Sequence, residues 1–283
     1  MLSMRGFTLF VGFALCWQGQ AWAERRIAPF DDKVILRVGN MWSNHDTSLQ
    51  LSGDRGLGIG VDLEDTFNLD EQISNVFQFS VLGRFKQRHR VGLQYYSFNR
   101  DSESKLQTDW QGDDISVEAG AQVESELNIR ITDISYQYSF VRDDKHELAG
   151  SFGLFWMDLD IDLRFSGQIM RENEENSEFL EGSEGVSAGL SAPLPVLGLN
   201  YTYAATSRWL TSVSFQYFSL RTNLVSGALV KVSVDTRYYF WDRFEVGGGL
   251  TMFDLAATVD SGDLKGRVDW SFWGPQLFLG WRF

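Results

Sequence analysis

The stretch ALVKVSVDTRYYF, residues 228–240, decides the fold, because apolar and polar residues alternate along it with a period of two. One face holds Val230, Val232, Val234, Thr236, Tyr238 and Phe240, and the other holds Lys231, Ser233, Asp235, Arg237 and Tyr239. A period of two places successive side chains on opposite faces of an extended chain. The stretch is therefore predicted to be a β-strand with one apolar face and one polar face.

The same alternation recurs along the chain after residue 30, and it predicts an all-β protein of ten strands. These strands cover residues 33–42, 74–85, 90–100, 122–141, 146–164, 194–206, 209–222, 228–241, 243–257 and 270–283. The stretch 47–64 fits either an extra hairpin or extensions of the first two strands. Counts of eight and twelve strands therefore stay open.

The connections between these strands alternate in length. Short polar turns are expected at residues 86–90, 142–145, 207–208 and 241–243. Mostly longer polar stretches are expected at residues 101–120, 166–193, 223–227 and 258–269. Short periplasmic turns and longer extracellular loops are typical of a transmembrane, antiparallel, up-and-down β-barrel of the outer membrane. A secreted β-sandwich also alternates, but aromatic residues at strand ends on the apolar face favour a bilayer.

The N-terminal segment and the composition agree with an exported barrel. Residues 1–23 combine Arg5, an apolar core and an Ala-Trp-Ala ending, which predicts a cleaved signal peptide and leaves residues 24–283 as the barrel domain. The mean hydropathy of −0.20 excludes a polytopic helical membrane protein. The net charge of −13 argues against nucleic-acid binding, which needs clustered Lys and Arg. Cys16 is the only cysteine, so neither a disulfide framework nor a cysteine metal site is expected.

The last ten residues carry a resemblance to a known class of proteins. Leu277, Leu279, Trp281 and Phe283 place an apolar residue at every second position up to a terminal Phe. This pattern resembles the C-terminal assembly signal of Gram-negative outer-membrane proteins, and residues 30–283 as a whole resemble small barrels of the OmpA and OmpW type. The resemblance implies recognition by periplasmic chaperones and the barrel-assembly machinery. It names no subfamily and no activity.

Charged residues on the predicted lumen face form the candidate site. They are Arg37, Arg84, Arg90, Lys231, Asp235, Arg237, Glu245 and Arg282. The set mixes both signs, so it fits two arrangements: side chains that line a water-filled pore, or side chains that pair and plug a narrow barrel. No cofactor or metal is expected. Asp158, Asp160 and Asp162 lack the Gly and the bidentate Glu of a calcium loop, and we interpret them as a solvated rim.

The histidines bear on an enzymatic alternative. His45 precedes Asp46 at the outer end of the first strand, and a His–Asp pair near a Ser has the groups of a base and its orienter. Adjacent strand residues point to opposite faces, however, which separates the pair. His89 and His146 lie at short turns, where we interpret them as solvated turn residues. The expectation is that the protein is not an enzyme.

The predicted extracellular end is acidic. Residues 101–126 hold eight acids against Lys105 alone, and residues 166–193 hold six glutamates against Arg171 alone. Solvated loops that charge keeps soluble are one interpretation. The other is contact with the divalent cations that bridge lipopolysaccharide phosphates.

The fourth and fifth predicted strands change parity away from their shared turn. Their apolar residues coincide on one face when paired residue numbers sum to 288, which sets Phe140 opposite Leu148 and Arg130 opposite Asp158 without a bulge. The apolar residues that this register turns inward are Leu127, Ile129, Ile131, Met157, Leu159, Ile161 and Leu163. They form either an apolar plug or a pocket for a hydrophobic ligand.

The sequence therefore predicts a monomeric outer-membrane barrel in contact with membrane lipid and lipopolysaccharide. Its expected function is structural or that of a small diffusion pore with acidic extracellular loops. Two alternatives stay open. One is an outer-membrane enzyme that acts on lipid A, phospholipid or peptide at the extracellular rim, and the other is a surface adhesin or a barrel that binds a hydrophobic ligand.

Overall fold

A computed structural model describes residues 30–53, 60–62, 74–107, 109–111, 115–171, 180–221, 225–261 and 264–283. The predicted signal peptide, residues 1–23, lies outside the described residues, as does part of the stretch 47–64. Within the described part of the chain, no helix is long and apolar enough to cross a membrane.

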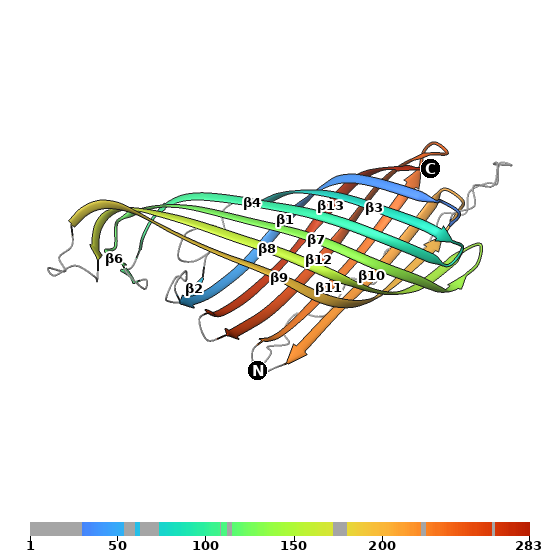
Figure 1. The fold of residues 1–283 in the computed structure, drawn as a ribbon. Coiled ribbons are helices and arrows are strands. Elements are labelled where there is room, and N and C mark those ends of the chain that lie inside the picture. The colour runs from blue at the N-terminus through green and yellow to red at the C-terminus, as the bar shows by residue number, and fades with distance from the viewer. Residues whose placement is uncertain are drawn as a thin grey trace, which may run out of the picture.

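Ten long antiparallel strands form one closed barrel (Figure 1). They are β1 (Val34–Gly53), β3 (Ser74–Lys86), β4 (His89–Lys105), β7 (Gln122–Arg142), β8 (His146–Arg171), β9 (Leu180–Ala204), β10 (Trp209–Arg221), β11 (Val225–Tyr239), β12 (Phe244–Ser261) and β13 (Leu264–Arg282). Each pairs with the next along the chain, and β1 pairs with β13 to close the ring. The predicted fold class and the count of ten are confirmed.

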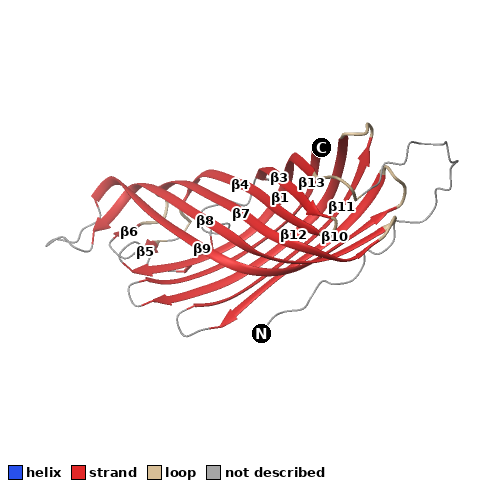
Figure 2. Cartoon of the chain, turned by 45° about the vertical axis from the view of Figure 1, so that its right-hand side comes forward, coloured by secondary structure: helices blue, strands red, loops and turns tan. Residues whose placement is uncertain are grey.

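Three short strands lie off this ring. β2 (Gly60–Asp62) pairs with β1, β5 (Trp110–Gln111) pairs with β6, and β6 (Ile115–Val117) pairs with β8. The stretch 47–64 thus contributes an extension of β1 and the short β2. Figure 2 shows that strands make up nearly all of the described chain.

Three of the predicted loops are wrong in extent, because the strands continue into them. β4 runs on to Lys105, β8 and β9 occupy most of residues 166–193, and β12 and β13 occupy nearly all of residues 258–269. Strands that rise above the membrane carry polar residues on their outer face. Above the membrane, the outer face no longer has the apolar residues that mark a lipid-facing strand in the sequence, although the strand continues.

The bilayer explains which side chains face outward. Leu277, Leu279 and Phe283 are 56%, 59% and 58% exposed on the outer wall, whereas the intervening Phe278 and Arg282 are buried in the lumen. Each strand alternates because lipid requires an apolar outer face while the narrow interior takes the other parity.

The outer face of β8 gives the height of the membrane band. Its outward residues are apolar from the level of His146 to Trp156, ten residues farther along, and the next outward residue is Asp158. At about 3.3 Å per residue and a tilt of about 40°, ten residues span about 25 Å, the height of a typical apolar band. Trp42 and Trp273 mark the same upper boundary on β1 and β13, since Asn44 and Ser271 lie beyond them.

The barrel has two unlike ends. The four short turns lie at one end, here called the short-turn end, which is the predicted periplasmic side. At the other end, the tall end, β7, β8 and β9 reach well beyond β10 and β11 (Figure 1). Residues 122–132, 157–171 and 180–192 therefore form a sheet above the membrane band, here called the tall sheet.

The register of β7 and β8 follows the predicted sum of 288 over most of their length, with Arg130 opposite Asp158. Near the turn the prediction is wrong. The register shifts between Ser139 and Val141, so Val141 and not Phe140 lies opposite Leu148. The bulge leaves both Phe140 and Val141 exposed on the lipid face, which keeps two consecutive apolar residues out of the lumen.

Candidate functional site in the barrel lumen

Paired charges close the lumen near the short-turn end, and we call this set the ion-pair layer. It contains Asp32, Arg37, Arg84, Arg90, Glu147, Arg237, Glu245 and Arg282. Two buried carboxylates, Glu147 and Glu245, each bind two arginines. The layer therefore links strands from different parts of the barrel wall across the lumen.

Glu147 is the first of these two anchors. It lies on β8, and its carboxylate oxygens are 2.8 Å from Arg84 Nη2 and 2.9 Å from Arg90 Nη1, on β3 and β4. The Ser139 hydroxyl also donates a hydrogen bond to it, at 2.7 Å. The Glu147 side chain is 2% exposed, so these donors replace the water that its charge would otherwise require.

Glu245 on β12 is the second anchor. It pairs with Arg37 of β1, and its Oε2 lies 3.7 Å from Arg237 Nε. Its neighbour Gly280 leaves room for it, since a Cβ at that position would come within 2.5 Å of Glu245 Oε1. Replacing this glycine would therefore displace the carboxylate.

Arg282 completes the layer beside the chain terminus. Its Nη1 lies 3.0 Å from Asp32 Oδ1, and its guanidinium lies 4.1 Å from the centre of the Tyr239 ring. Asp32 precedes β1, outside the membrane-spanning strands. Burial raises the pKa of the Asp32 carboxyl above its usual range, and the charge of Arg282 opposes this rise. The terminal strand is thus tied to the segment that leads into the first one.

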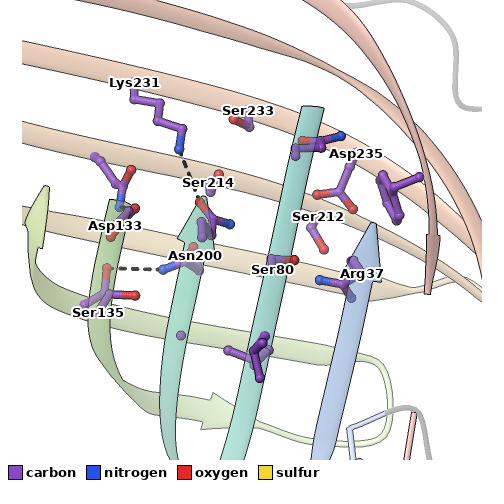
Figure 3. A pocket seen from close by; sticks show the side chains of 18 of the residues that line it. Arg37, Ser80, Asp133, Ser135, Asn200, Ser212, Ser214, Lys231, Ser233 and Asp235 are labelled. Carbon is purple, nitrogen blue, oxygen red and sulfur yellow. Dashed lines mark hydrogen bonds between the residues drawn. The ribbon is translucent and has the colours of Figure 1, made fainter. Parts of the chain in front are cut away.

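A polar chamber of about 160 Å³ lies above the ion-pair layer (Figure 3). Its lining contains the serines 80, 135, 151, 212, 214 and 233 and the amides Gln78, Gln94, Gln137, Asn200, Gln216 and Gln276. Small hydroxyl residues leave space that larger side chains would fill. By volume alone, the chamber has room for on the order of ten water molecules.

A lysine crosses the upper part of this chamber. Lys231 on β11 is 5% exposed, and its ammonium donates to Gln94 Oε1 at 3.2 Å and to the Tyr96 hydroxyl at 3.1 Å, both on β4. β4 and β11 lie on opposite sides of the ten-strand ring. Lys231 therefore spans the lumen.

Aromatic rings close the lumen above the chamber, and we call this set the aromatic layer. It consists of Phe98, Phe155, Phe253, Trp270 and Phe272, all buried. Phe98 of β4 lies 5.1 Å from Phe272 of β13 between ring centres, and Phe272 lies 5.0 Å from Phe253 of β12. Phe253 then stacks on Phe155 of β8 at 5.5 Å. Rings from four strands thus form a continuous path across the lumen.

His45 packs at the edge of the aromatic layer, and its contacts fix its proton. The indole N–H of Trp270 donates to His45 Nδ1 at 3.2 Å, because an indole nitrogen can only donate. In the neutral ring Nε2 then carries the hydrogen, and Nε2 lies 2.7 Å from Ser43 Oγ. His45 therefore donates to Ser43 instead of accepting its proton, and Asp46 is exposed on the opposite face as expected.

No protein-family model matches the sequence, and no curated protein matches it either. Among solved structures, the chain is similar to the outer membrane protease OmpT from Escherichia coli, with a TM-score of 0.58 and 11% identity over 90% of this chain and 97% of that chain. The fold is that of an outer-membrane β-barrel. At this identity the likeness shows the fold alone. The toluene transporter TbuX from Ralstonia pickettii matches at a TM-score of 0.38 and 10% identity, over 91% of each chain.

The predicted lumen charges of this barrel all lie in the lumen. Arg37, Arg84, Arg90, Arg237, Glu245 and Arg282 belong to the ion-pair layer, Lys231 spans the chamber, and Asp235 pairs with Arg237 at 3.1 Å. All of these side chains except Lys231 form ion pairs. Leu277, Leu279, Trp281 and Phe283 face outward on the last strand.

Three carboxylates and the aromatic layer were not predicted from the sequence. The carboxylates are Asp32, Glu147 and Asp133, the last of which lines the chamber. Glu147 follows the turn that precedes β8, and the bulge beside it obscures its parity. Asp133 has the same parity as Ile129 and Ile131, which is a usable signal. His89 and His146 are not simply solvated, because their Nδ1 atoms lie 2.6 and 2.8 Å from tyrosine hydroxyls on neighbouring strands.

The tall sheet carries polar groups outside and apolar groups inside. Arg130 forms its ion pair with Asp160, at 2.8 Å, and not with Asp158 directly across from it. Asp158 instead accepts hydrogen bonds from Trp156 and Ser191. The inward residues Leu127, Ile129, Ile131, Met157, Leu159, Ile161 and Leu163 are at most 2% exposed, as a packed core requires.

Proposed function

We propose that the protein is a closed structural barrel of the outer membrane and not an open diffusion pore. The continuous ring contacts of the aromatic layer, from Phe98 to Phe155, carry this proposal. The ion-pair layer below supports it, because a solute would have to separate charges that are buried with their partners. Removing one partner of a buried pair costs about 3–5 kcal/mol, so such a layer seldom opens by chance.

A liposome-swelling assay tests this proposal. Vesicles that contain the folded protein should swell in arabinose no faster than protein-free vesicles. A Phe98→Ala/Phe253→Ala variant, which removes two rings of the aromatic layer, should swell no more than threefold faster while the ion-pair layer is intact. Phe152→Ala, on the lipid face, is the matched control. Rapid swelling with the unsubstituted protein would refute the closed barrel.

We also propose that His45 has no catalytic role. Its Nε2 donates to Ser43, so the dyad lacks the free base that a serine nucleophile needs. The ring is enclosed by Phe98, Trp270 and Phe272, with centres 5.4 to 6.0 Å away. His45→Ala should leave the lipid A mass spectrum of expressing cells unchanged. A mass shift that depends on His45 would favour the enzymatic alternative.

The outer face of the tall sheet is better described as a solvated surface than as a cation site. The carboxylates of Asp158, Asp160 and Asp162 accept hydrogen bonds from neighbouring side chains, which leaves fewer oxygens for an ion. Deleting residues 181–187 should therefore leave the magnesium dependence of outer-membrane integrity unchanged. The packed inner face likewise favours a plug over a pocket for a hydrophobic ligand.

A further inference from the structure

The polar chamber between the two closing layers contains a carboxylate whose hydrogen bonding is incomplete. Asp133 on β7 is 2% exposed, and one of its oxygens accepts from Gln216 Nε2 at 2.7 Å. Its other oxygen, Oδ1, is buried without a hydrogen-bond partner. Burying a carboxylate oxygen without a hydrogen-bond donor costs free energy. A molecule inside the chamber that donates a hydrogen bond to Asp133 Oδ1 would remove this cost.

A cation faces the same chamber from the opposite wall. Lys231 reaches Gln94, and Gln94 lies beside Asp133 in the β4–β7 register. Lys231 and Asp133 nevertheless form no direct ion pair; the described partners of the ammonium are Gln94 Oε1 and the Tyr96 hydroxyl, both neutral. The chamber thus presents a negative and a positive group that are not joined by an ion pair.

A second polar group without a partner, a hydrogen-bond donor, also lines the chamber. The Gln78 amide nitrogen, which lines the chamber, is buried without an acceptor. The chamber therefore offers a free acceptor at Asp133 and a free donor at Gln78. Gln78 lies opposite Tyr96 in the β3–β4 register, and the Tyr96 hydroxyl is a partner of Lys231. A bound molecule must supply both a donor and an acceptor to satisfy them.

The size of the chamber limits the molecule. A cavity of about 150 Å³ in another protein holds benzene, which has six heavy atoms. The chamber here measures about 160 Å³, so it takes a molecule of about that size. The smallest α-amino acids are of this size and carry an ammonium and a carboxylate.

We propose that this chamber binds a small zwitterion of the α-amino acid type, with its ammonium group at Asp133 Oδ1 and its carboxylate toward Lys231 and Gln78. Arg37 and Arg237 line the chamber as well. Because both residues belong to the ion-pair layer, we expect entry from the short-turn end to require movement of that layer. Exchange is therefore slow compared with binding at an open site. The proposal does not depend on conductance, because an occluded site fills at equilibrium whether or not the barrel conducts.

Equilibrium dialysis of the folded, full-length protein with radiolabelled L-serine tests the proposal. After incubation long enough for exchange, we expect saturable binding of one molecule per barrel. Propionate, ethylamine and glycerol, which carry one charge or none, should compete at least tenfold less well. Equal competition by any of these three would overturn the zwitterion class, and no binding of L-serine would leave water as the occupant and overturn the site.

Two substitutions locate the binding. Asp133→Asn and Lys231→Gln should each weaken L-serine binding at least tenfold, since each removes one charge of the pair. Asp254→Asn, an exposed carboxylate on the outer face of β12, is the matched control and should bind as the unsubstituted protein does. If Asp133→Asn fails to fold, Lys231→Gln decides alone. Unchanged binding in a folded Asp133→Asn or Lys231→Gln variant would overturn the proposed placement.

Discussion

The two layers that close the lumen use opposite chemistry. In the ion-pair layer, Glu147 accepts hydrogen bonds from two buried arginines and from Ser139, so the loss of this one carboxylate leaves several groups unpaired. In the aromatic layer, most rings contact several others, so the loss of one ring leaves the remaining contacts in place. These rings are Phe98, Phe253, Trp270 and Phe272. Single substitutions should therefore lower the stability strongly in the ion-pair layer and only modestly in the aromatic layer.

This difference follows from the free energy that is lost when each kind of side chain is removed. A buried charge without its partner carries its full desolvation cost, whereas a missing ring costs its own burial and the cavity that it leaves. A barrel with both layers combines a closure of fixed geometry with one that tolerates repacking.

The largest effect is expected from Glu147→Ala. This change leaves Arg84 and Arg90 buried beside each other without a carboxylate, so the free energy of unfolding should fall by about 3–5 kcal/mol. Urea unfolding in lipid vesicles, followed by tryptophan fluorescence, measures it. Asp254→Ala, on the exposed outer face, serves as control and should change the value by less than about 0.5 kcal/mol. Equal effects of the two changes would show that the buried contacts of Glu147 contribute no more to stability than an exposed carboxylate does.

The next largest effect is a coupling energy between Arg37 and Glu245. Each single substitution, Arg37→Met or Glu245→Gln, unbalances the buried pair, and the double substitution removes both partners. The double variant should therefore be more stable than the sum of the single effects predicts, by about 0.5–3 kcal/mol. A double-mutant cycle from the same unfolding measurements gives this value. Strict additivity would show that the pair is not coupled.

A smaller effect is expected in the aromatic layer. Phe155→Leu keeps an apolar side chain against Phe253, so the free energy of unfolding should fall by less than about 1.5 kcal/mol. The same unfolding measurement applies. A decrease in the free energy of unfolding as large as that of Glu147→Ala would contradict the expected tolerance of this layer to single substitutions.

The smallest effect is expected on the outer face of the tall sheet. Arg130 and Asp160 form an ion pair with both side chains about half exposed, 53% and 49%. Exposed pairs of this kind contribute about 0.2–1 kcal/mol, and Arg130→Ala should lower the free energy of unfolding by no more than that.

Cysteines at positions 130 and 158 should also crosslink, because these positions lie opposite each other. Crosslinking of 130 to 157 or 159 in preference would contradict the register.

The wall of the barrel was predictable because the bilayer imposes one parity on each strand. Val230, Val232 and Val234 face outward as the alternation in 228–240 predicts, and Lys231 faces the lumen. Above the membrane this constraint ends. Gln168 and Glu181 lie opposite each other on β8 and β9, in the stretch 166–193 that the sequence predicts as a loop because polar residues dominate it.

The interior was less predictable, because it depends on which side chains meet across the lumen. Alternation placed Arg37 and Glu245 inside but did not pair them, since they lie on β1 and β12, far apart in sequence. Phe98 and Phe253 occupy lumen parity, so in the sequence they look like local breaks in the polar face. Only the closed ring brings such residues together in one layer.

Single-channel recording in a planar lipid bilayer tests the closed lumen most directly. The purified, folded protein inserted at neutral pH in 1 M KCl should give no stable unitary current, because the ion-pair layer and the aromatic layer both block the lumen. Insertion itself is checked independently by protease protection of vesicle-reconstituted protein. A steady ohmic conductance that persists for seconds in the unsubstituted protein would contradict this account.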